Sequence, residues 1–344
     1  MKPLKVLQVA FTYMGTVVGA GFATGQEILQ FFTRFGFWGA AGIGLSTMMF
    51  IWLGAKMMLI AYDIGARSYE DLNKVLFGER LGVWVSHFML IVLVGVNAVM
   101  LAGAGSIFHE HLGLSYQAGL LLTMLACFLL LRGGMSAIMT INTIVVPIML
   151  LFTVFLIIDT LQTPGSDRWL LEISDLSPWA AWASPFLYAA FNLCMAQAVL
   201  VPLGREIADR RTIIAGAWTG GIGIGFMLLV GHIALSTYMP GIAQYAIPMG
   251  GIARELGIYI QWIYLFLIFA EIFTTLVSDI FGLTLQLEER LNWPRQLIVA
   301  TVLVFCYSVS QFGFGTLLGT LYPAFGAVAL GWLLLIVRQK TALR

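Results

Sequence analysis

Residues 12–27 read TYMGTVVGAGFATGQE and form the least helix-like part of an apolar run from residue 5 to residue 33. Within eleven residues this stretch holds Gly15, Gly19, Gly21 and Gly25. A glycine inside a helix costs about 1 kcal/mol relative to alanine, and backbone that leaves the helix at membrane depth is tolerated only where it lines an enclosed cavity. A glycine-faced helix packed on a neighbour is the alternative, but the acid Glu27 beside the glycines favours an interruption between Gly15 and Gly25.

The composition places most of the chain in lipid. Of the 344 residues, 60% are hydrophobic and only 10% are charged, and the mean hydropathy is +0.92. A soluble domain carries about 25% charged residues. We therefore expect membrane lipid and a small molecule as partners, with no nucleic acid, and the sequence leaves the oligomeric state open.

Ten apolar stretches are long enough to cross a bilayer. They lie at about 5–33, 38–62, 82–106, 114–131, 137–161, 179–203, 212–238, 258–286, 295–312 and 315–337. If the N-terminus is cytoplasmic, 14 of the 18 Lys and Arg residues fall on the inner side, Lys56 lies within the second span, and only Arg34, Arg168 and Arg254 fall outside. This asymmetry predicts a multi-pass protein with both termini in the cytoplasm.

The ten predicted spans divide into two groups of five, so the second group enters the membrane from the side opposite to the first. This arrangement is typical of an inverted repeat. We expect an all-α polytopic protein with one membrane domain over residues 1–344. The first five-helix repeat is expected over 4–162 and the second over 178–338.

The span 258–286 carries Glu271 near its midpoint, followed by Thr274 and Thr275. An acid at the bilayer centre costs several kcal/mol unless it is paired, hydrated or protonated, and is functional by default. Glu271 is therefore a candidate proton carrier, a partner for a substrate amine or part of a cation site; a protonated acid bonding across helices is the structural alternative. Asp279 and Lys56 lie at comparable depth and are candidates for a gating ion pair, although Lys56 could instead extend to the interface.

The residues Val18 to Phe22 resemble the Gly-X-Gly break in the first helix of the amino acid–polyamine–organocation (APC) superfamily, whose members share the LeuT-type fold. The longer string from Gly19 to Ile28 is similar to the YkvI-like bacterial branch of that superfamily. The resemblance implies a bacterial cytoplasmic (inner) membrane location and discontinuous helices 1 and 6. The span 179–203 has no glycine, which departs from the pattern of helix 6.

The resemblance also implies two sets of binding residues. Sodium would be held by the carbonyls of Gly15 and Val18 and the hydroxyls of Thr274 and Thr275. A solute carboxylate would meet the backbone amides freed by the break. The expected substrate-binding residues are Gly19, Ala20, Gly21, Phe22, Asn97, Tyr188, Phe191, Asn192 and Glu271, with coupling or gating by Glu27, Lys56 and Asp279.

The leading functional hypothesis is a sodium-coupled symporter of a small zwitterion such as an amino acid or a related amine, with sodium and no organic cofactor. Some members of the superfamily replace the sodium with a lysine of helix 5, and the span 137–161 has none. Proton coupling through Glu27 or Glu271 and a non-transporting membrane sensor are the alternatives. An enzyme is not expected, because no HExxH, GxSxG or Cys/His cluster occurs.

Overall fold

The computed structural model describes the chain except for residues 1–2, 172–176, 208, 245–246, 312–328 and 339–344. The described residues form helices, turns and loops without an extended sheet. The elements of the first half are α1 (Pro3–Val17), α2 (Ala20–Ala23), α3 (Gln26–Phe31), η1 (Thr33–Phe35), α4 (Phe37–Ile64), α5 (Tyr69–Phe77), α6 (Glu79–Leu112), α7 (Tyr116–Leu131) and α8 (Gly134–Gln162).

The second half continues after the loop that contains the short helix α9 (Arg168–Leu171). Its elements are α10 (Pro178–Glu206), α11 (Arg210–Thr237), η2 (Gly241–Gln244), α12 (Pro248–Glu255), α13 (Ile258–Glu288) and α14 (Arg295–Ser310). A last described helix covers Ala329–Arg338.

Six of the described helices are long and apolar enough to cross a membrane, namely α4, α6, α8, α10, α11 and α13. The helices α7 and α14 are shorter apolar helices that coincide with the predicted spans 114–131 and 295–312. The first predicted span is divided among α1, α2 and α3. Most of the tenth, 315–337, lies outside the described residues.

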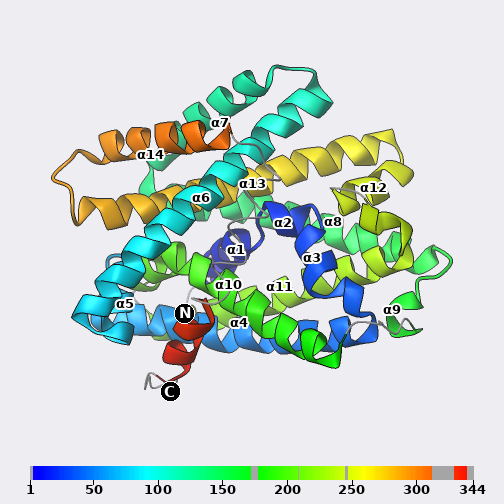
Figure 1. The fold of residues 1–344 in the computed structure, drawn as a ribbon, viewed down its shortest axis with the longest axis horizontal. Helices are drawn as coiled ribbons and strands as arrows, with labels where there is room; N and C mark the ends of the chain where they lie inside the picture. Colours follow the sequence, from blue (N-terminus) through cyan, green and yellow to red (C-terminus); the bar gives the residue numbers. More distant parts are fainter. Residues whose placement is uncertain (1–2, 172–176, 208, 245–246, 312–328, 339–344) are drawn as a thin grey trace.

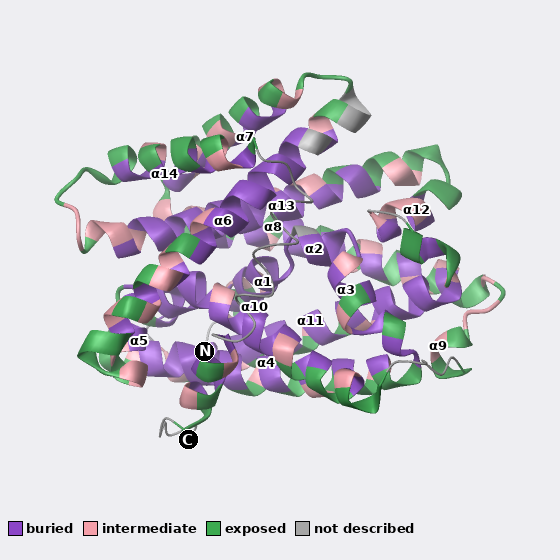
Figure 2. Cartoon of the chain, viewed as in Figure 1, coloured by how far each residue is buried: buried purple, intermediate pink, exposed green. Residues whose placement is uncertain are grey.

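The buried centre of the bundle surrounds α1. Figure 1 shows α1 and α2 in the middle of the molecule, and α1 packs against α8, α10, α11 and α13. In Figure 2 the buried residues gather around this centre, whereas the outer faces of α7 and α14 are exposed. A broken helix is thereby enclosed by protein, as unwound backbone at membrane depth requires.

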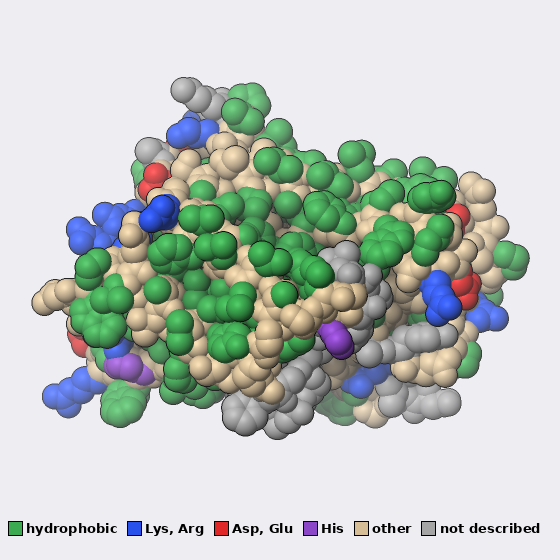
Figure 3. Space-filling model, turned by 90° about the horizontal axis from the view of Figure 1, so that it is seen from above, with side chains coloured by type: hydrophobic (Ala, Val, Ile, Leu, Met, Phe, Trp, Pro, Cys, Tyr) green, Lys and Arg blue, Asp and Glu red, His purple; other side chains and the backbone are tan. Residues whose placement is uncertain are grey.

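The outer surface has the pattern of a membrane protein. Large exposed apolar side chains cover α7 and α8, including Leu121, Leu125, Leu151 and Ile158. Figure 3 shows hydrophobic side chains across the middle of one face, with most Lys, Arg, Asp and Glu side chains toward its two ends. The helix α5 lies at one end of the long axis, and α9 and α12 lie at the other (Figure 1).

The structure corrects the expectation that helix 6 is discontinuous. The helix α10 runs unbroken from Pro178 to Glu206 and contains Pro185 and Pro202 without losing its helical form. Its centre has no glycine and is rich in alanine and other residues that favour a helix. Without a glycine the backbone gains little from leaving the helix, so of the two helices that were expected to be discontinuous, the first is broken and the sixth is continuous.

Candidate site at the break in the first helix

The backbone leaves the helix at Val18 and Gly19. The amide of Val18 donates to the Met14 carbonyl at 2.8 Å, and the amide of Gly19 donates to the Val17 carbonyl at 3.1 Å. A second short helix begins at Ala20, and Gly25 follows it with φ of +83°, a conformation that favours glycine. The structure therefore confirms the interruption predicted between Gly15 and Gly25.

Close packing explains two of the glycines. A Cβ atom at Gly15 would lie 1.8 Å from Oδ1 of Asn142 on α8, and one at Gly21 would lie 2.2 Å from Oε1 of Glu27. Glu27 itself is buried in the first turn of α3. The carboxylate of Glu27 thus lies against the backbone of α2, next to the break.

The helix α13 brings a hydroxyl to the end of α1. Oγ1 of Thr275 lies 3.3 Å from the Gly15 carbonyl oxygen and 3.2 Å from that of Val18. The Thr275 hydroxyl oxygen therefore lies beside two carbonyl oxygens. Because a hydroxyl has a single proton, it can donate a hydrogen bond to only one of them at a time. Three of the four residues that the sequence analysis assigned to sodium therefore meet in the structure.

The fourth residue, Thr274, is oriented differently. Its hydroxyl donates to the carbonyl of Glu271 on its own helix at 3.1 Å. This is the local bond that buried threonines commonly make in helices. The Thr274 hydroxyl and the Glu271 carbonyl are therefore bonded to each other within α13, and the described part of the chain shows no hydrogen bond from the Thr274 hydroxyl to α1.

Glu271 lies on the same face of α13 as the residues that contact the break. Tyr264, Glu271 and Thr275 are spaced by seven and four residues, which places them on one stripe of a helix. The hydroxyl of Tyr264 donates to the carbonyl of Ala23 at the end of α2. The Glu271 side chain is fully buried, and neither carboxylate oxygen has a hydrogen-bond partner among the described residues.

The other predicted substrate residues are buried at different places around the centre. The amide nitrogen of Asn97 on α6 donates to Leu93, while that of Asn192 donates to the carbonyl of Tyr188 on α10. The Tyr188 ring packs in a cluster with the rings of Phe31, Phe32 and Phe50. Phe191 lines a void of about 10 Å³ beside α6, and Phe22 lines one of about 30 Å³ with Tyr264.

Lys56 and Asp279 do not form the predicted ion pair. The ammonium of Lys56 donates to the carbonyl of Val337 at 2.9 Å and lies over the ring of Trp52. The ion pairs recorded for the described residues do not include Asp279, which is buried on α13. A carbonyl at the end of the helix Ala329–Arg338 is a favourable partner for a cation. Lys56 and Val337 are 281 residues apart, so the sequence did not indicate that they would meet.

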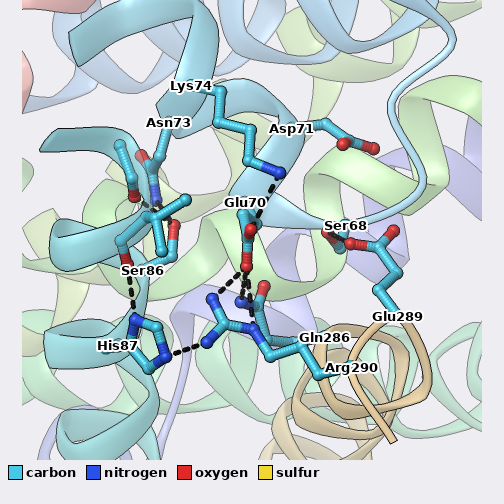
Figure 4. Close-up of polar contacts among 12 residues, drawn as sticks. Ser68, Glu70, Asp71, Asn73, Lys74, Ser86, His87, Gln286, Glu289 and Arg290 are labelled. Atoms are coloured by element: carbon cyan, nitrogen blue, oxygen red, sulfur yellow. Dashed lines mark hydrogen bonds and ion pairs between the residues drawn. The ribbon is translucent and has the colours of Figure 1, made fainter. Parts of the chain in front are cut away.

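A polar network at the α5 end of the bundle was not predicted. Figure 4 shows Glu70 of α5 accepting hydrogen bonds from Lys74, Gln286 and Arg290, with Arg290 also bonded to His87 of α6. Burial alone raises the pKa of Glu70. The hydrogen bonds from Lys74 and Arg290 and the positive charges of these residues together lower it by a larger amount, so the pKa of Glu70 lies below its ordinary value of 4.5. The four-residue spacing of Glu70 and Lys74 is the one sequence signal that could have suggested part of this network.

The hydroxyl of Ser68 extends this network by donating to Glu289 at 2.7 Å. A cavity of about 770 Å³ lies at the same end, along α13 from Leu285 to Phe281. Its charged lining residues are Arg67, Arg205, Glu206, Glu288, Glu289 and Arg295. At 1.5 Å per residue, Phe281 is about 9 Å along the helix from Thr275. The cavity thus lies at the charged end of the bundle, and its lining on α13 stops about 9 Å short of Thr275.

The chain matches no protein-family model, but it has clear relatives. It is 38% identical over 340 residues to the uncharacterized membrane protein YkvI of Bacillus subtilis, and the match covers 98% of this chain and 96% of YkvI. It is also 25% identical over 317 residues to the uncharacterized protein YyaD of the same organism, covering 92% of this chain and 91% of YyaD.

Three solved structures share the fold. MhsT in complex with L-phenylalanine has a TM-score of 0.71 and 18% identity, covering 98% of this chain and 88% of MhsT. A Na⁺-coupled sialic acid symporter has a TM-score of 0.74 and 14% identity, covering 97% and 79%. Mhp1, a nucleobase-cation-symport-1 family transporter with bromovinylhydantoin bound, has a TM-score of 0.64 and 14% identity, covering 96% and 77%.

These structural likenesses establish the architecture, because each of them covers 96% or more of this chain with a TM-score of 0.64 or higher. The identity to YkvI establishes the family. The chain therefore belongs to the YkvI family of multi-pass membrane proteins and has the LeuT-type fold.

Proposed function

We propose that this protein is a secondary transporter that couples the uptake of a small zwitterion, such as an amino acid or a related amine, to sodium. The observation that carries the proposal is the position of the Thr275 hydroxyl beside the carbonyl oxygens of Gly15 and Val18. Such oxygens come together because α1 is broken and α13 passes the break. The Na⁺ coupling of one structural neighbour, the sialic acid symporter, supports this reading.

The ligand chemistry supports an alkali cation. Carbonyl and hydroxyl oxygens are hard ligands that replace the hydration shell of such an ion. Thr275, Gly15 and Val18 supply three of them. Rotation of the Thr274 side chain away from its bond to the Glu271 carbonyl would add two more neutral oxygens from α13.

The cavity at the α5 end supports a route for ions and solute between the break and one side of the membrane. The positive-inside rule assigns that end to the cytoplasm, because Arg67, Arg205 and Arg295 line the cavity. In this proposal the protein lies in the bacterial cytoplasmic membrane with ten spans, both termini inside and the two halves related as a five-plus-five inverted repeat. The Glu70 network then closes the cytoplasmic side, since it joins α5, α6 and α13.

The solute would bind at the break itself. Its carboxylate would accept from the amides of Ala20, Gly21 and Phe22, which begin α2. Asn97 and Phe191, which lie on α6 and α10, would form the walls together with Tyr188 and Asn192. Glu27, which lies against α2, and Asp279, which is one turn after Thr275 on α13, would affect the coupling between sodium and solute. The proposal assigns no enzymatic activity and no organic cofactor to the chain.

A thermal-shift screen tests this function. The purified protein is heated with each of a set of amino acids and amines, in sodium chloride and in potassium chloride of equal ionic strength. A solute present at 100 times its Kd stabilises the folded protein by about 2.7 kcal/mol. We expect at least one solute to raise the melting temperature more in sodium than in potassium.

Failure of every solute in both salts would contradict the assigned substrate class. Equal stabilisation in the two salts would remove sodium coupling and favour a proton-coupled carrier. Solutes that stabilise the protein but are not accumulated by proteoliposomes under a sodium gradient would favour the sensor instead of the transporter.

A further inference from the structure

The backbone at the break has few carbonyl oxygens left for a positively charged solute. The carbonyl acceptors from Val17 to Gly25 are paired with the following donors: the amides of Gly19, Ala23, Gly25, Leu29 and Met249 and the hydroxyls of Thr24, Tyr264 and Thr275. Of this segment, only the carbonyl of Ala20 has no partner named in that set. A protonated amine entering here would have to share almost any main-chain oxygen with a donor that is already bonded to it.

The opposite wall, formed by α10, offers no freed main-chain acceptors at its centre. The helix α10 is continuous from Pro178 to Glu206, so its central carbonyls accept from the amides four residues later. The side-chain amide of Asn192 also donates, to the carbonyl of Tyr188. The absence of a break in α10 therefore removes a set of main-chain acceptors that a second interruption would have provided.

Glu271 is a buried acidic acceptor near the break, whereas the unbonded side-chain oxygen of Asn142 beside Gly15 is a neutral one. Its side chain is fully buried, and neither oxygen is bonded within the described part of the chain. It lies on α13 between Tyr264 and Thr275, both of which contact residues 15–23. A carboxylate in such a place costs several kcal/mol unless a positive partner or a proton reaches it.

The buried basic groups that the structure describes are engaged elsewhere. Lys56 donates to Val337 at the end of the last described helix. The ring of His232 on α11 is bonded to Thr33 and packs against Trp169. None of the ion pairs among described residues includes Glu271. Within its described residues, the protein thus keeps a buried carboxylate next to its proposed solute site without a recorded counter-charge.

We propose that Glu271 binds the protonated amine of the transported solute through a charge-assisted hydrogen bond. This assignment rests on the proposed function and narrows its substrate class. Solutes must carry an ammonium group, and analogues in which a hydroxyl replaces the amine are excluded. The excluded solutes would leave the carboxylate buried without a partner, which is the kind of penalty that gives polar sites their discrimination.

The test uses a panel of matched probes. Each probe pair is an L-amino acid and the 2-hydroxy acid of the same side chain, and binding is followed by thermal shift and calorimetry in sodium chloride. Wild-type protein is compared with Glu271→Gln, which keeps the size of the side chain but removes its charge. Glu271→Asp keeps the charge on a shorter side chain and serves if the Gln variant does not fold.

For wild-type protein we expect stabilisation by amino acids and none by their hydroxy acids. Glu271→Gln should bind the amino acids at least about tenfold more weakly, and its stabilisation by sodium alone should be retained. Glu271→Asp should keep the preference for the amine with reduced affinity. Retention of the sodium response separates this test from a test of the transport proposal.

Three results would overturn the assignment. The first is equal binding of amino acids and hydroxy acids by wild-type protein. The second is unchanged amino-acid affinity in Glu271→Gln, with loss only of the pH dependence of uptake, which would make Glu271 a proton carrier. The third is failure of every amine to bind wild-type protein while sodium still stabilises it. If sodium also has no effect, the proposed function itself fails.

Discussion

Two buried glutamates in the bundle, Glu70 and Glu271, have opposite surroundings. Glu70 lies at the α5 end and accepts from three donors, two of them positively charged (Figure 4). Glu271 lies at the level of the break and has no hydrogen-bond partner within the described residues. The residues around Glu70 join three helices to one another, whereas we propose that a ligand supplies the missing partner of Glu271.

The difference has a physical consequence. A buried charge whose partners are built into the protein contributes to the stability of the fold, and removal of one partner leaves the others uncompensated. A buried acid without a partner lowers stability and persists because it has a function. The two regions should therefore respond to substitution in opposite ways.

The largest effect is expected for Glu70→Ala. It leaves Lys74 and Arg290 without their shared acceptor, and loss of one member of a buried pair costs 3–5 kcal/mol in typical cases. Because Lys74 and Arg290 keep some access to water, we expect the free energy of unfolding to fall by about 2–3 kcal/mol and the melting temperature to fall by several degrees. Tryptophan fluorescence during heating in detergent measures the melting temperature.

Two variants serve as controls for Glu70→Ala. Glu255→Ala removes an exposed acid at the end of α12 and should leave the melting temperature nearly unchanged. Glu271→Gln should leave it unchanged or raise it. A melting temperature that fell equally in Glu70→Ala and Glu271→Gln would contradict the contrast between the two sites.

A smaller loss is expected for Gly15→Ala, which probes how tightly the break is packed. The added Cβ would lie 1.8 Å from Oδ1 of Asn142, so the α8 side chain must move. Overpacking of this kind costs about 1–3 kcal/mol. Gly44→Ala on α4 is the matched control, because a Cβ there meets no atom within 4 Å, and it should be neutral or slightly stabilising. Equal melting temperatures for the two variants would show that the break is loosely packed.

The smallest effect concerns acid stability. Because the pKa of Glu70 in the folded protein lies below 4.5, its ionised form contributes stability above that pH, and this contribution is lost as the pH falls further. The melting temperature of wild-type protein should therefore decrease more steeply below about pH 4.5 than that of Glu70→Gln. Parallel curves for the two proteins would mean that the network does not depend on the ionised form of Glu70.

The two regions also differ in how much the sequence revealed. The break was predictable, because glycine spacing is local information and Gly25 needs a left-handed conformation. The missing glycine in the centre of α10 was visible as well, although the family resemblance pointed to a second break. The position of Thr275 beside Gly15 and Val18 came from the resemblance and not from the residues themselves.

The long-range partners of Glu70 and Lys56 were not visible in the sequence, because they come from distant parts of the chain. Glu70 meets Arg290 across 220 residues, and Lys56 meets Val337 across 281. Charge and depth suggested Asp279 as the partner of Lys56, but helix rotation and the position of the last described helix decided otherwise. Periodicity can place a residue on a face of its helix, but the neighbour of that face is fixed only by the packing of the whole bundle.

The central claim is that the break and Thr275 together bind sodium, and equilibrium binding of radioactive sodium tests it most directly. Wild-type protein is compared with Thr275→Val and with Thr284→Val, a control that removes a buried hydroxyl from the same helix where it bonds only to Ile280. We predict saturable sodium binding to the wild type and to Thr284→Val, and binding at least about tenfold weaker in Thr275→Val. Equal affinity in all three proteins, or no saturable binding to the wild type, would contradict the account.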